Sequence, residues 1–139
     1  MNPYLIMGEI ADAAEAMPRL VGRVHRQPVG TAVPPAFIVL YPEDVVFDAT
    51  HGRGSDVVNG GFVVLIGKPF ERSTAELLGE LAAGDGENSI KQALETYGGY
   101  TALDELVVKS IQFDVVSLGG VEYMAGVGTL EIIGEGKST

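Results

Sequence analysis

Two apolar segments separated by an acidic, glycine-containing stretch constrain the fold of this chain more than any other feature. The segments are residues 36–41 and 62–66, and both are unbroken runs rich in β-branched and aromatic side chains. Such a run is typical of a strand that is covered on both faces of its sheet. The stretch between them contains the turn Gly52-Arg53-Gly54. We therefore predict a long antiparallel hairpin whose base lies in the core and whose tip projects from it.

Irregularities are expected in both arms of this hairpin. Pro42 cannot donate a ladder hydrogen bond, so the first arm should have an edge or a bulge there and resume as a strand at residues 45–47. Gly60 and Gly61 are adjacent in the second arm, which favours a bulge or the close approach of another backbone. We prefer a bulge to a tight turn at this point, because the hairpin already has a turn.

The chain before the hairpin has the pattern of a helix followed by a short strand. Asn2-Pro3 places a capping side chain and a proline where a helix begins, and apolar residues from Leu5 onward recur at helical spacing. Pro18 should end the helix. Residues 20–25 are β-like, and His25, which lies between two arginines, is expected to be an exposed strand residue.

Two shorter helices and a helical turn are expected after the hairpin. Ser73 with Glu76, and Ser89 with Gln92, have the spacing of a capping box, in which the side chains of the two residues satisfy backbone N–H groups at a helix start. Glycines follow both predicted helices and should end them. Residues 101–105 are predicted to form a single helical turn.

The last third of the chain has the pattern of a second hairpin. Apolar and polar residues alternate over residues 110–115, which is typical of a half-buried strand. Gly119 and Gly120 then supply a turn. The apolar positions of the returning strand change parity by Leu130, which predicts a bulge or twist near Gly126 or Gly128.

The order of elements indicates the fold class. Helix, strand, long hairpin, two helices and hairpin follow one another without βαβ alternation, so we predict an α+β fold. Its mostly antiparallel β-sheet has long hairpins and packs against two to three helices. A chain of 139 residues is expected to form a single domain, here with a flexible tail at residues 134–139.

Composition excludes several classes of protein. The chain has 9 Lys and Arg against 19 Asp and Glu, a net charge of −10, which argues against affinity for nucleic-acid phosphates. It has no cysteine, which excludes disulfides, thiolate zinc sites and cysteine nucleophiles. The first residues lack the basic region of a signal peptide, and no apolar run approaches the ~18 residues that a membrane helix needs. We therefore expect a protein made in the cytoplasm that does not bind a membrane.

The strongest candidate for a functional site is acidic and lies in the middle of the first hairpin. Its members are Glu43, Asp44, Asp48, His51, Arg53 and Asp56. Such a group suits metal binding or acid–base catalysis, a contact with a partner, or simply a solvated charged surface. Catalysis needs a concave site that excludes water, which a hairpin tip does not provide. The mixed charges suit self-association, in which the cations of one tip meet the anions of the next copy.

Motifs for other chemistry are missing from the sequence. It has no glycine-rich phosphate-binding loop, no nucleophile elbow and no pair of histidines at helical spacing. No catalytic residue, cofactor or metal ligand is expected.

Taken in order, these segments resemble the tail terminator proteins of long-tailed bacteriophages, in the version found in actinobacterial phages and prophages. The resemblance covers nearly the whole chain. Besides the first helix, it rests on Pro34-Pro35-Ala36, Ile38-Val39-Leu40-Tyr41-Pro42, Phe47-Asp48, Gly52-Arg53-Gly54-x-Asp56, Ser89-Ile90-Lys91-x-Ala93-Leu94, Ile111-x-Phe113-Asp114-Val115 and Gly120-Val121-Glu122-Tyr123.

The resemblance implies a structural protein of the virion that is not an enzyme. Tail terminators form a hexameric ring on the last ring of the major tail tube protein, stop tube growth and present a surface to the head-completion or connector protein. DNA passes through the lumen without specific binding. The ring would lie at the head-proximal end of the tail after assembly in the bacterial cytoplasm. The acidic group, including Glu43, Asp44 and Asp48, would then lie at a subunit interface or line the lumen. The alternatives are a head–tail connector or neck protein and a small acidic metal-binding enzyme.

Overall fold

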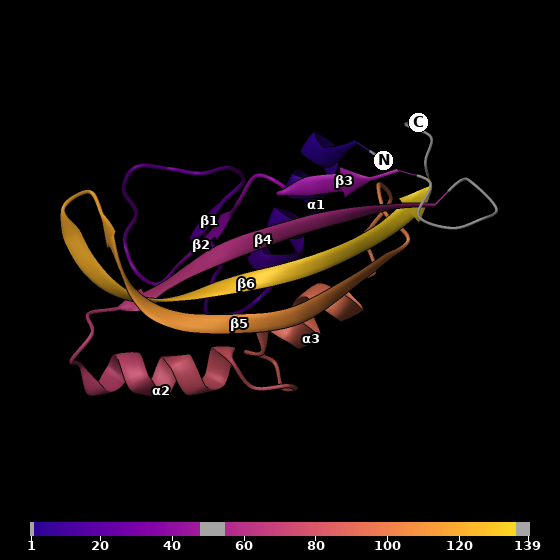
Figure 1. The fold of residues 1–139 in the computed structure, drawn as a ribbon. Helices are drawn as coiled ribbons and strands as arrows, with labels where there is room; N and C mark the ends of the chain where they lie inside the picture. Colours follow the sequence, from indigo (N-terminus) through magenta and orange to yellow (C-terminus); the bar gives the residue numbers. More distant parts are fainter. Residues whose placement is uncertain (1, 48–54, 136–139) are drawn as a thin grey trace.

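A six-stranded sheet packed against helices forms the framework of the protein (Figure 1). The computed structural model describes residues 2–47 and 55–135. This part of the chain contains three helices and a mostly antiparallel sheet, which confirms the predicted α+β class. The elements are α1 (Pro3–Glu15), β1 (Val24–His25), β2 (Ala36–Val39), β3 (Asp44–Val46), β4 (Ser55–Gly67), α2 (Arg72–Leu81), α3 (Ile90–Thr96), β5 (Glu105–Leu118) and β6 (Val121–Glu135).

The sheet has the strand order β1-β2-β4-β6-β5, and β3 pairs with β4 beyond the end of β2. Every pair is antiparallel except β1 with β2. The two arms of the predicted first hairpin are confirmed, since β2 and β3 both pair with β4, and the turn predicted at Gly52-Arg53-Gly54 lies outside the described residues. The predicted strand at residues 20–25 is shorter than expected. Backbone bonds from Leu20 N–H to Met17 O and from Arg23 N–H to Leu20 O form turns there, so only Val24–His25 is extended.

The first arm of this hairpin has the irregularity that Pro42 predicts. Val39 lies opposite Phe62, and Asp44 lies opposite Asn59, so four residues of the first arm face two of β4. The backbone N–H groups on either side of the extra residues still reach β4, and the chain leaves the ladder only around Pro42. The bulge therefore lies in the arm that contains the proline.

The second arm does not have the bulge predicted at Gly60 and Gly61. The register of β4 against β6 is continuous through both glycines and shifts only between Leu65 and Gly67. A Cβ atom on Gly61 would lie 2.8 Å from the carbonyl oxygen of Gly128 on β6. Glycine is needed here because two backbones approach closely, which was the other interpretation of the adjacent glycines.

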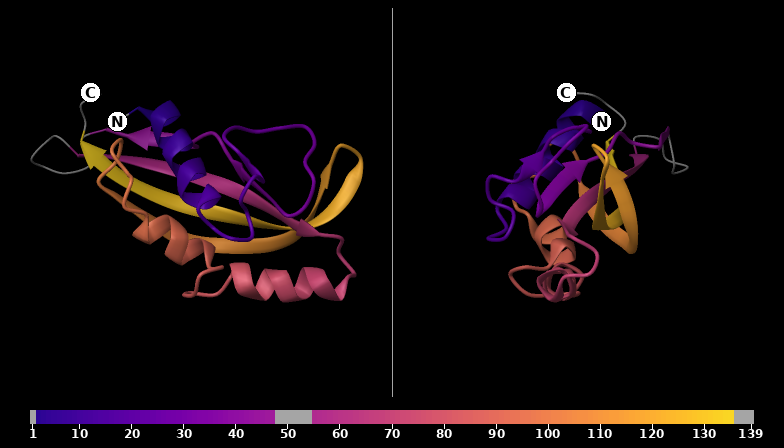
Figure 2. Two further views of the ribbon diagram at one scale, coloured as in Figure 1. Left: turned by 180° about the vertical axis from the view of Figure 1, so that it is seen from behind. Right: turned by 90° about the vertical axis from the view of Figure 1, so that its left-hand side faces the viewer.

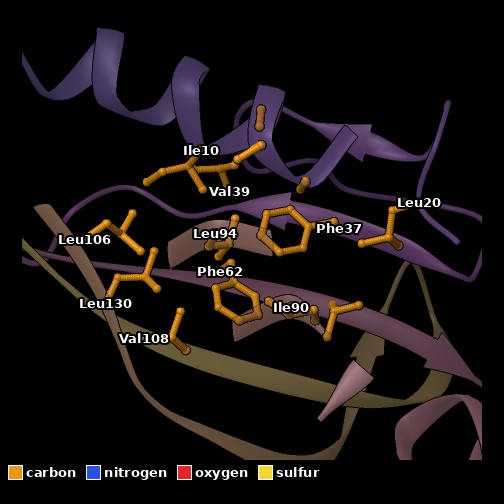
Figure 3. Packing of buried hydrophobic residues seen from close by; sticks show 14 of the residues in the cluster. Ile10, Leu20, Phe37, Val39, Phe62, Ile90, Leu94, Leu106, Val108 and Leu130 are labelled. Atoms are coloured by element: carbon orange, nitrogen blue, oxygen red, sulfur yellow. The ribbon is translucent and has the colours of Figure 1, made fainter. Parts of the chain in front are cut away.

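Both faces of the central strands are covered, as their unbroken apolar runs predict. All four residues of β2 are buried. Phe37 and Val39 belong to the main core beneath the helices, whereas Ala36 and Ile38 belong to a smaller cluster on the opposite face. In the main core the ring of Phe37 stacks on that of Phe62, with centroids 4.8 Å apart, and Ile10 of α1 packs above them (Figure 3).

The two-sided sheet also explains the pattern of β6, for which the predicted bulge near Gly126 or Gly128 is wrong. β6 pairs with β5 in one register from Val121 to Thr129. Its odd-numbered residues, such as Ala125, face the smaller cluster, and its even-numbered residues, such as Leu130, face the main core. The parity never changes. Glycine stands at two even positions because side chains of neighbouring strands fill the space there: a Cβ on Gly128 would lie 2.0 Å from the ring of Phe62.

The predicted helix starts are confirmed in two of three cases. The Asn2 side chain accepts hydrogen bonds from the first turn of α1, and Ser89 Oγ accepts one from Gln92 N–H at the start of α3. The capping box at Ser73 is wrong, because α2 begins at Arg72 after Glu71, whose side chain makes no capping bond. Leu5 is also not a core residue, since 44% of it is exposed.

The last hairpin is longer than predicted. β5 begins at Glu105, and residues 101–105 do not form the predicted helical turn. Gly119 and Gly120 have φ angles of 61° and 80°, which fits the tight turn expected between the strands. β6 continues to Glu135, so the predicted tail at residues 134–139 begins within the strand, and residues 136–139 lie outside the described part. Figure 2 shows the β5–β6 hairpin running the length of the sheet and curling at its tip.

Candidate assembly surfaces

The predicted acidic group does not form one surface in the described part of the chain. Glu43 and Asp44 are exposed beside the bulge, where Asp44 Oδ1 accepts a hydrogen bond from Asn59 Nδ2 at 2.5 Å. Asp56 is different, because it lies within β4 opposite Gly134 and is only 4% exposed. It is therefore a buried strand residue in this chain and not part of an exposed acidic patch. The other three members, Asp48, His51 and Arg53, lie outside the described residues.

Exposed apolar side chains accompany Glu43 and Asp44 on β3 and in the residues that flank it. Tyr41 is 66% exposed and Phe47 is 73% exposed, and Val46 between them is also exposed. β3 pairs with β4 on one side, and no described strand pairs with its other side. We call residues 41–47 the β3 edge. It combines carboxylates, large apolar groups and an open strand, which are features of a surface that binds another protein.

The opposite edge of the sheet is formed by β5 (Figure 1). Its first residues are covered by α3, and Glu95 Oε2 accepts a hydrogen bond from Val108 N–H at 2.9 Å. Beyond Lys109, where the register against β6 shifts, Phe113 and Val115 are exposed, and no described strand pairs with the outer side of β5. We call residues 110–118 the β5 edge.

Glu95 has an unusual electrostatic environment at the covered end of β5. Burial raises the pKa of its carboxyl, but the hydrogen bonds from Lys91 and Val108, together with the charge of Lys91, outweigh this effect and lower the pKa below its ordinary value. Lys91 Nζ lies 2.5 Å from Glu95 Oε2. The ionised carboxylate therefore ties α3 to the edge strand and belongs to the framework of the fold.

A groove of about 670 Å³ lies along the N-terminal half of α1. We call it the α1 groove. Its apolar lining comes from three separate parts of the chain, namely α1, the segment after β1 and the end of the first hairpin arm. The principal members are Tyr4, Leu5, Met7, His25, Val29 and Tyr41. His25 is half-buried in this wall, so the prediction of an exposed strand residue is wrong.

Charged side chains hold the floor and rim of the α1 groove in place. Arg26 donates to the backbone carbonyl of Gly8 at 3.0 Å and forms an ion pair with Asp12. Glu9 accepts hydrogen bonds from Thr101 N–H at 2.8 Å and from Thr101 Oγ1 at 2.6 Å. These bonds join α1 to the segments on either side of it, and the groove is therefore a preformed feature of the subunit.

Among the large apolar residues that the structure describes, Phe70 is the most exposed, at 99%. It lies between Pro69 and the start of α2. In this segment the Glu71 N–H donates a hydrogen bond to the Lys68 carbonyl oxygen, with an N–O distance of 3.4 Å. Phe70 and the α1 groove were not predicted as candidate sites from the sequence. A proline followed by an aromatic residue, just before a helix, is the only local signal for Phe70, and the groove has none because its walls are distant in sequence.

Two kinds of feature are absent from the described residues. No group of three or more histidine, aspartate or glutamate side chains there is arranged to hold a metal ion. In the same part of the chain, no helix has the length and apolar character needed to cross a membrane.

Comparison of the sequence with protein-family models and with curated proteins gives no match. The geometry of the surfaces described above and the resemblance noted in the sequence are therefore the basis for a functional proposal.

Proposed function

We propose that this chain is a phage tail terminator, a subunit that assembles into a ring, caps the tail tube and joins it to the head. The observation that carries the proposal is the exposure of apolar side chains at both edges of one sheet. The β3 edge exposes Tyr41, Val46 and Phe47, and the β5 edge exposes Phe113 and Val115. Single exposed apolar residues are common, but groups of them at open strand edges favour contact with another chain.

The positions of the two edges favour a ring over a two-fold dimer. They lie on opposite sides of the sheet, separated by β4 and β6. A subunit that contacts its neighbour through two different surfaces makes a head-to-tail interface, and such interfaces close into rings when the rotation between copies allows it. A dimer with two-fold symmetry would use one surface twice and leave the other exposed.

The charge of the chain is compatible with a ring through which DNA passes. A net charge of −10 gives the subunit little attraction for phosphates. Glu43 and Asp44 are exposed and would repel DNA if they faced the lumen, or would meet cations of a neighbouring copy if they lay at an interface. The resemblance implies that these carboxylates lie either in the lumen or at a subunit interface, and the proposal includes both alternatives.

Electron microscopy of the protein mixed with tail tubes tests the proposed function. The tubes would be assembled from a major tail tube protein of the phage. A terminator should bind as a ring at one end of each tube, which class averages of the tube ends would show. It should also stop further growth of the tube when more tube protein is added. Rings that bind the head connector but leave tube growth unchanged would favour the neck protein instead. Absence of rings at either place would contradict both assignments.

A further inference from the structure

Phe70 has the features of a side chain that anchors a protein contact. Its side chain is fully exposed, so it adds nothing to the packing of this subunit. Pro69 restricts the backbone before it, and α2 begins two residues after it at Arg72, so the ring projects from a segment with little freedom. An aromatic side chain held in this way loses little conformational entropy on binding, and aromatic residues are enriched among those that dominate binding energy.

The α1 groove has the size and lining to receive such a ring. Its volume of about 670 Å³ exceeds that of one phenylalanine side chain several-fold, which leaves room for the neighbouring backbone. Leu5 and Tyr41 expose apolar surface at the groove, and Met7 is buried in its wall. An aromatic ring inserted here would exchange water for apolar neighbours on several sides.

The cation beside Phe70 complements the charge of the groove. Lys68 precedes the ring by two residues, and Glu71 follows it directly. The groove presents the carboxylates of Glu9 and Asp12 and the guanidinium of Arg26. Arg26 is paired with Asp12, whereas Glu9 accepts hydrogen bonds from Thr101 and Ala102 and forms no ion pair within the described residues, so these three groups leave a net negative charge at the groove. Lys68 would therefore be attracted to the negative charge of the groove, which favours binding of the segment that carries Phe70, whereas Arg26 is already paired with Asp12 and offers Glu71 no free partner.

Phe70 cannot enter the α1 groove of its own copy. The segment leading into α2 lies at the far end of the molecule from the N-terminus of α1 in Figures 1 and 2. Lys68 and Glu71 line a different hollow, beside Pro34 and Leu77, and share no lining residue with the α1 groove. Contact between these two places therefore joins two copies through different surfaces, which is the head-to-tail arrangement that a ring requires.

We propose that Phe70 of one copy inserts into the α1 groove of the next copy and is the principal anchor of the ring. This inference rests on the proposed function, because it names the contact by which the ring forms. The inference also extends the proposed function. Tyr41 belongs to both the β3 edge and the lining of the α1 groove, so a neighbour bound in the groove would also cover the β3 edge.

Two charge-introducing variants and a control test the contact. Phe70→Glu removes the anchor, and Leu5→Glu places a charge in the groove on an exposed helix position. Each should weaken self-association at least 30-fold, as loss of a dominant aromatic contact does. Val33→Glu makes the same kind of change at another exposed apolar residue that does not line the groove, and should leave self-association within threefold of the unsubstituted chain. Sedimentation velocity gives the association constants, and far-UV circular dichroism checks folding.

Mixing the two defective variants provides the sharpest measurement. The Leu5→Glu chain keeps its anchor, and the Phe70→Glu chain keeps its groove, so a mixture has one functional contact per pair. Native mass spectrometry should show 1:1 heterodimers and no rings, at concentrations well above those at which the unsubstituted chain assembles. Tyr4→Glu replaces Leu5→Glu if the latter fails to fold.

The outcomes separate the inference from the proposed function. If the unsubstituted chain forms rings and Phe70→Glu forms them equally well, the anchor is wrong and the ring proposal stands. A mixture that remains monomeric also overturns the pairing of Phe70 with the groove. If the unsubstituted chain forms no assembly alone or on tail tubes, the anchor and the proposed function fail together.

Discussion

Substitution of Gly128 by alanine provides a stringent test of how the core is packed. A Cβ atom there would lie 2.0 Å from Phe62 Cε2 and 2.2 Å from Phe62 Cζ. Carbon atoms in contact normally lie about 3.5–4.0 Å apart, so the ring would have to move by roughly 1.5 Å. Phe62 is fully buried and stacked on Phe37, so a shift of one ring displaces the other. Overpacking of this kind costs about 1–3 kcal/mol, and we expect about 3 kcal/mol because two rings must shift together.

Gly60→Ala is the matched control. It lies opposite Leu130 on the neighbouring strand, and a Cβ there meets only Ile132 Cδ1, at 3.5 Å, which is an ordinary contact. Its backbone is not in the left-handed region, so alanine is tolerated, and the reduced freedom of the unfolded chain should make the variant unchanged or about 0.5 kcal/mol more stable. Urea unfolding followed by far-UV circular dichroism gives both free energies of unfolding.

A double variant identifies the cause of the destabilisation. If the methyl group of Gly128→Ala clashes with the ring of Phe62, then Phe62→Leu should remove much of the clash. The two substitutions should then cost about 1–2 kcal/mol less together than the sum of their separate effects. Gly128→Ala with a free energy of unfolding within about 0.5 kcal/mol of that of Gly60→Ala would refute the packing of Phe62 against β6.

Two further predictions concern the ends of α3. Ser89 is fully buried, and its Oγ donates a hydrogen bond to the Ala83 carbonyl at 2.5 Å and also caps the helix. Ser89→Ala should therefore lower the free energy of unfolding, measured in urea, by about 1–2 kcal/mol. A loss below about 0.3 kcal/mol would contradict this capping role. Glu95 has a lowered pKa in the folded chain, so its stabilising effect is present above the ordinary value of 4.5 and is lost as pH falls through the folded value. The difference in stability between the unsubstituted chain and Glu95→Gln should therefore shrink between pH 7 and pH 3, and a constant difference would show that the charge of Glu95 has no part in it.

Local patterns predicted the parts of the fold that local interactions determine. Asn2-Pro3 and Ser89 cap their helices as expected, because a capping side chain bonds to backbone groups only two or three residues away. The unbroken apolar run of β2 predicted cover on both faces, since no other environment buries every residue of a strand.

Predictions failed where residues distant in sequence decide the outcome. Ser73 and Glu76 have the spacing of a capping box, but α2 starts at Arg72, and Thr74 is buried with its Oγ1 2.5 Å from where a Cβ on Gly67 would stand. The first turn of α2 therefore packs against the end of β4, and the helix starts at a residue that the local pattern did not predict. The glycines of β6 were similarly interpreted as a bulge, although Gly128 makes room for an aromatic ring of the adjacent strand.

The candidate surfaces were only partly predictable from the sequence. Glu43 and Asp44 were selected for their charge and are exposed beside the bulge, as a projecting hairpin arm requires. Asp56 was selected by the same criterion but is buried, at a position of β4 that lies opposite Gly134 of β6. The exposure of Phe70 depends on how the whole chain packs, and neither composition nor spacing indicates which apolar residues stay outside the core.

The mass of the assembled protein tests the ring proposal most directly. Native mass spectrometry of the unsubstituted chain, alone and after release from tail tubes, measures the number of copies in one assembly. The proposal predicts a single closed species with a fixed number of subunits, six if the resemblance to tail terminators holds, and no ladder of intermediate sizes. A chain that remains a monomer in both preparations, or that forms only a two-fold dimer, would contradict it.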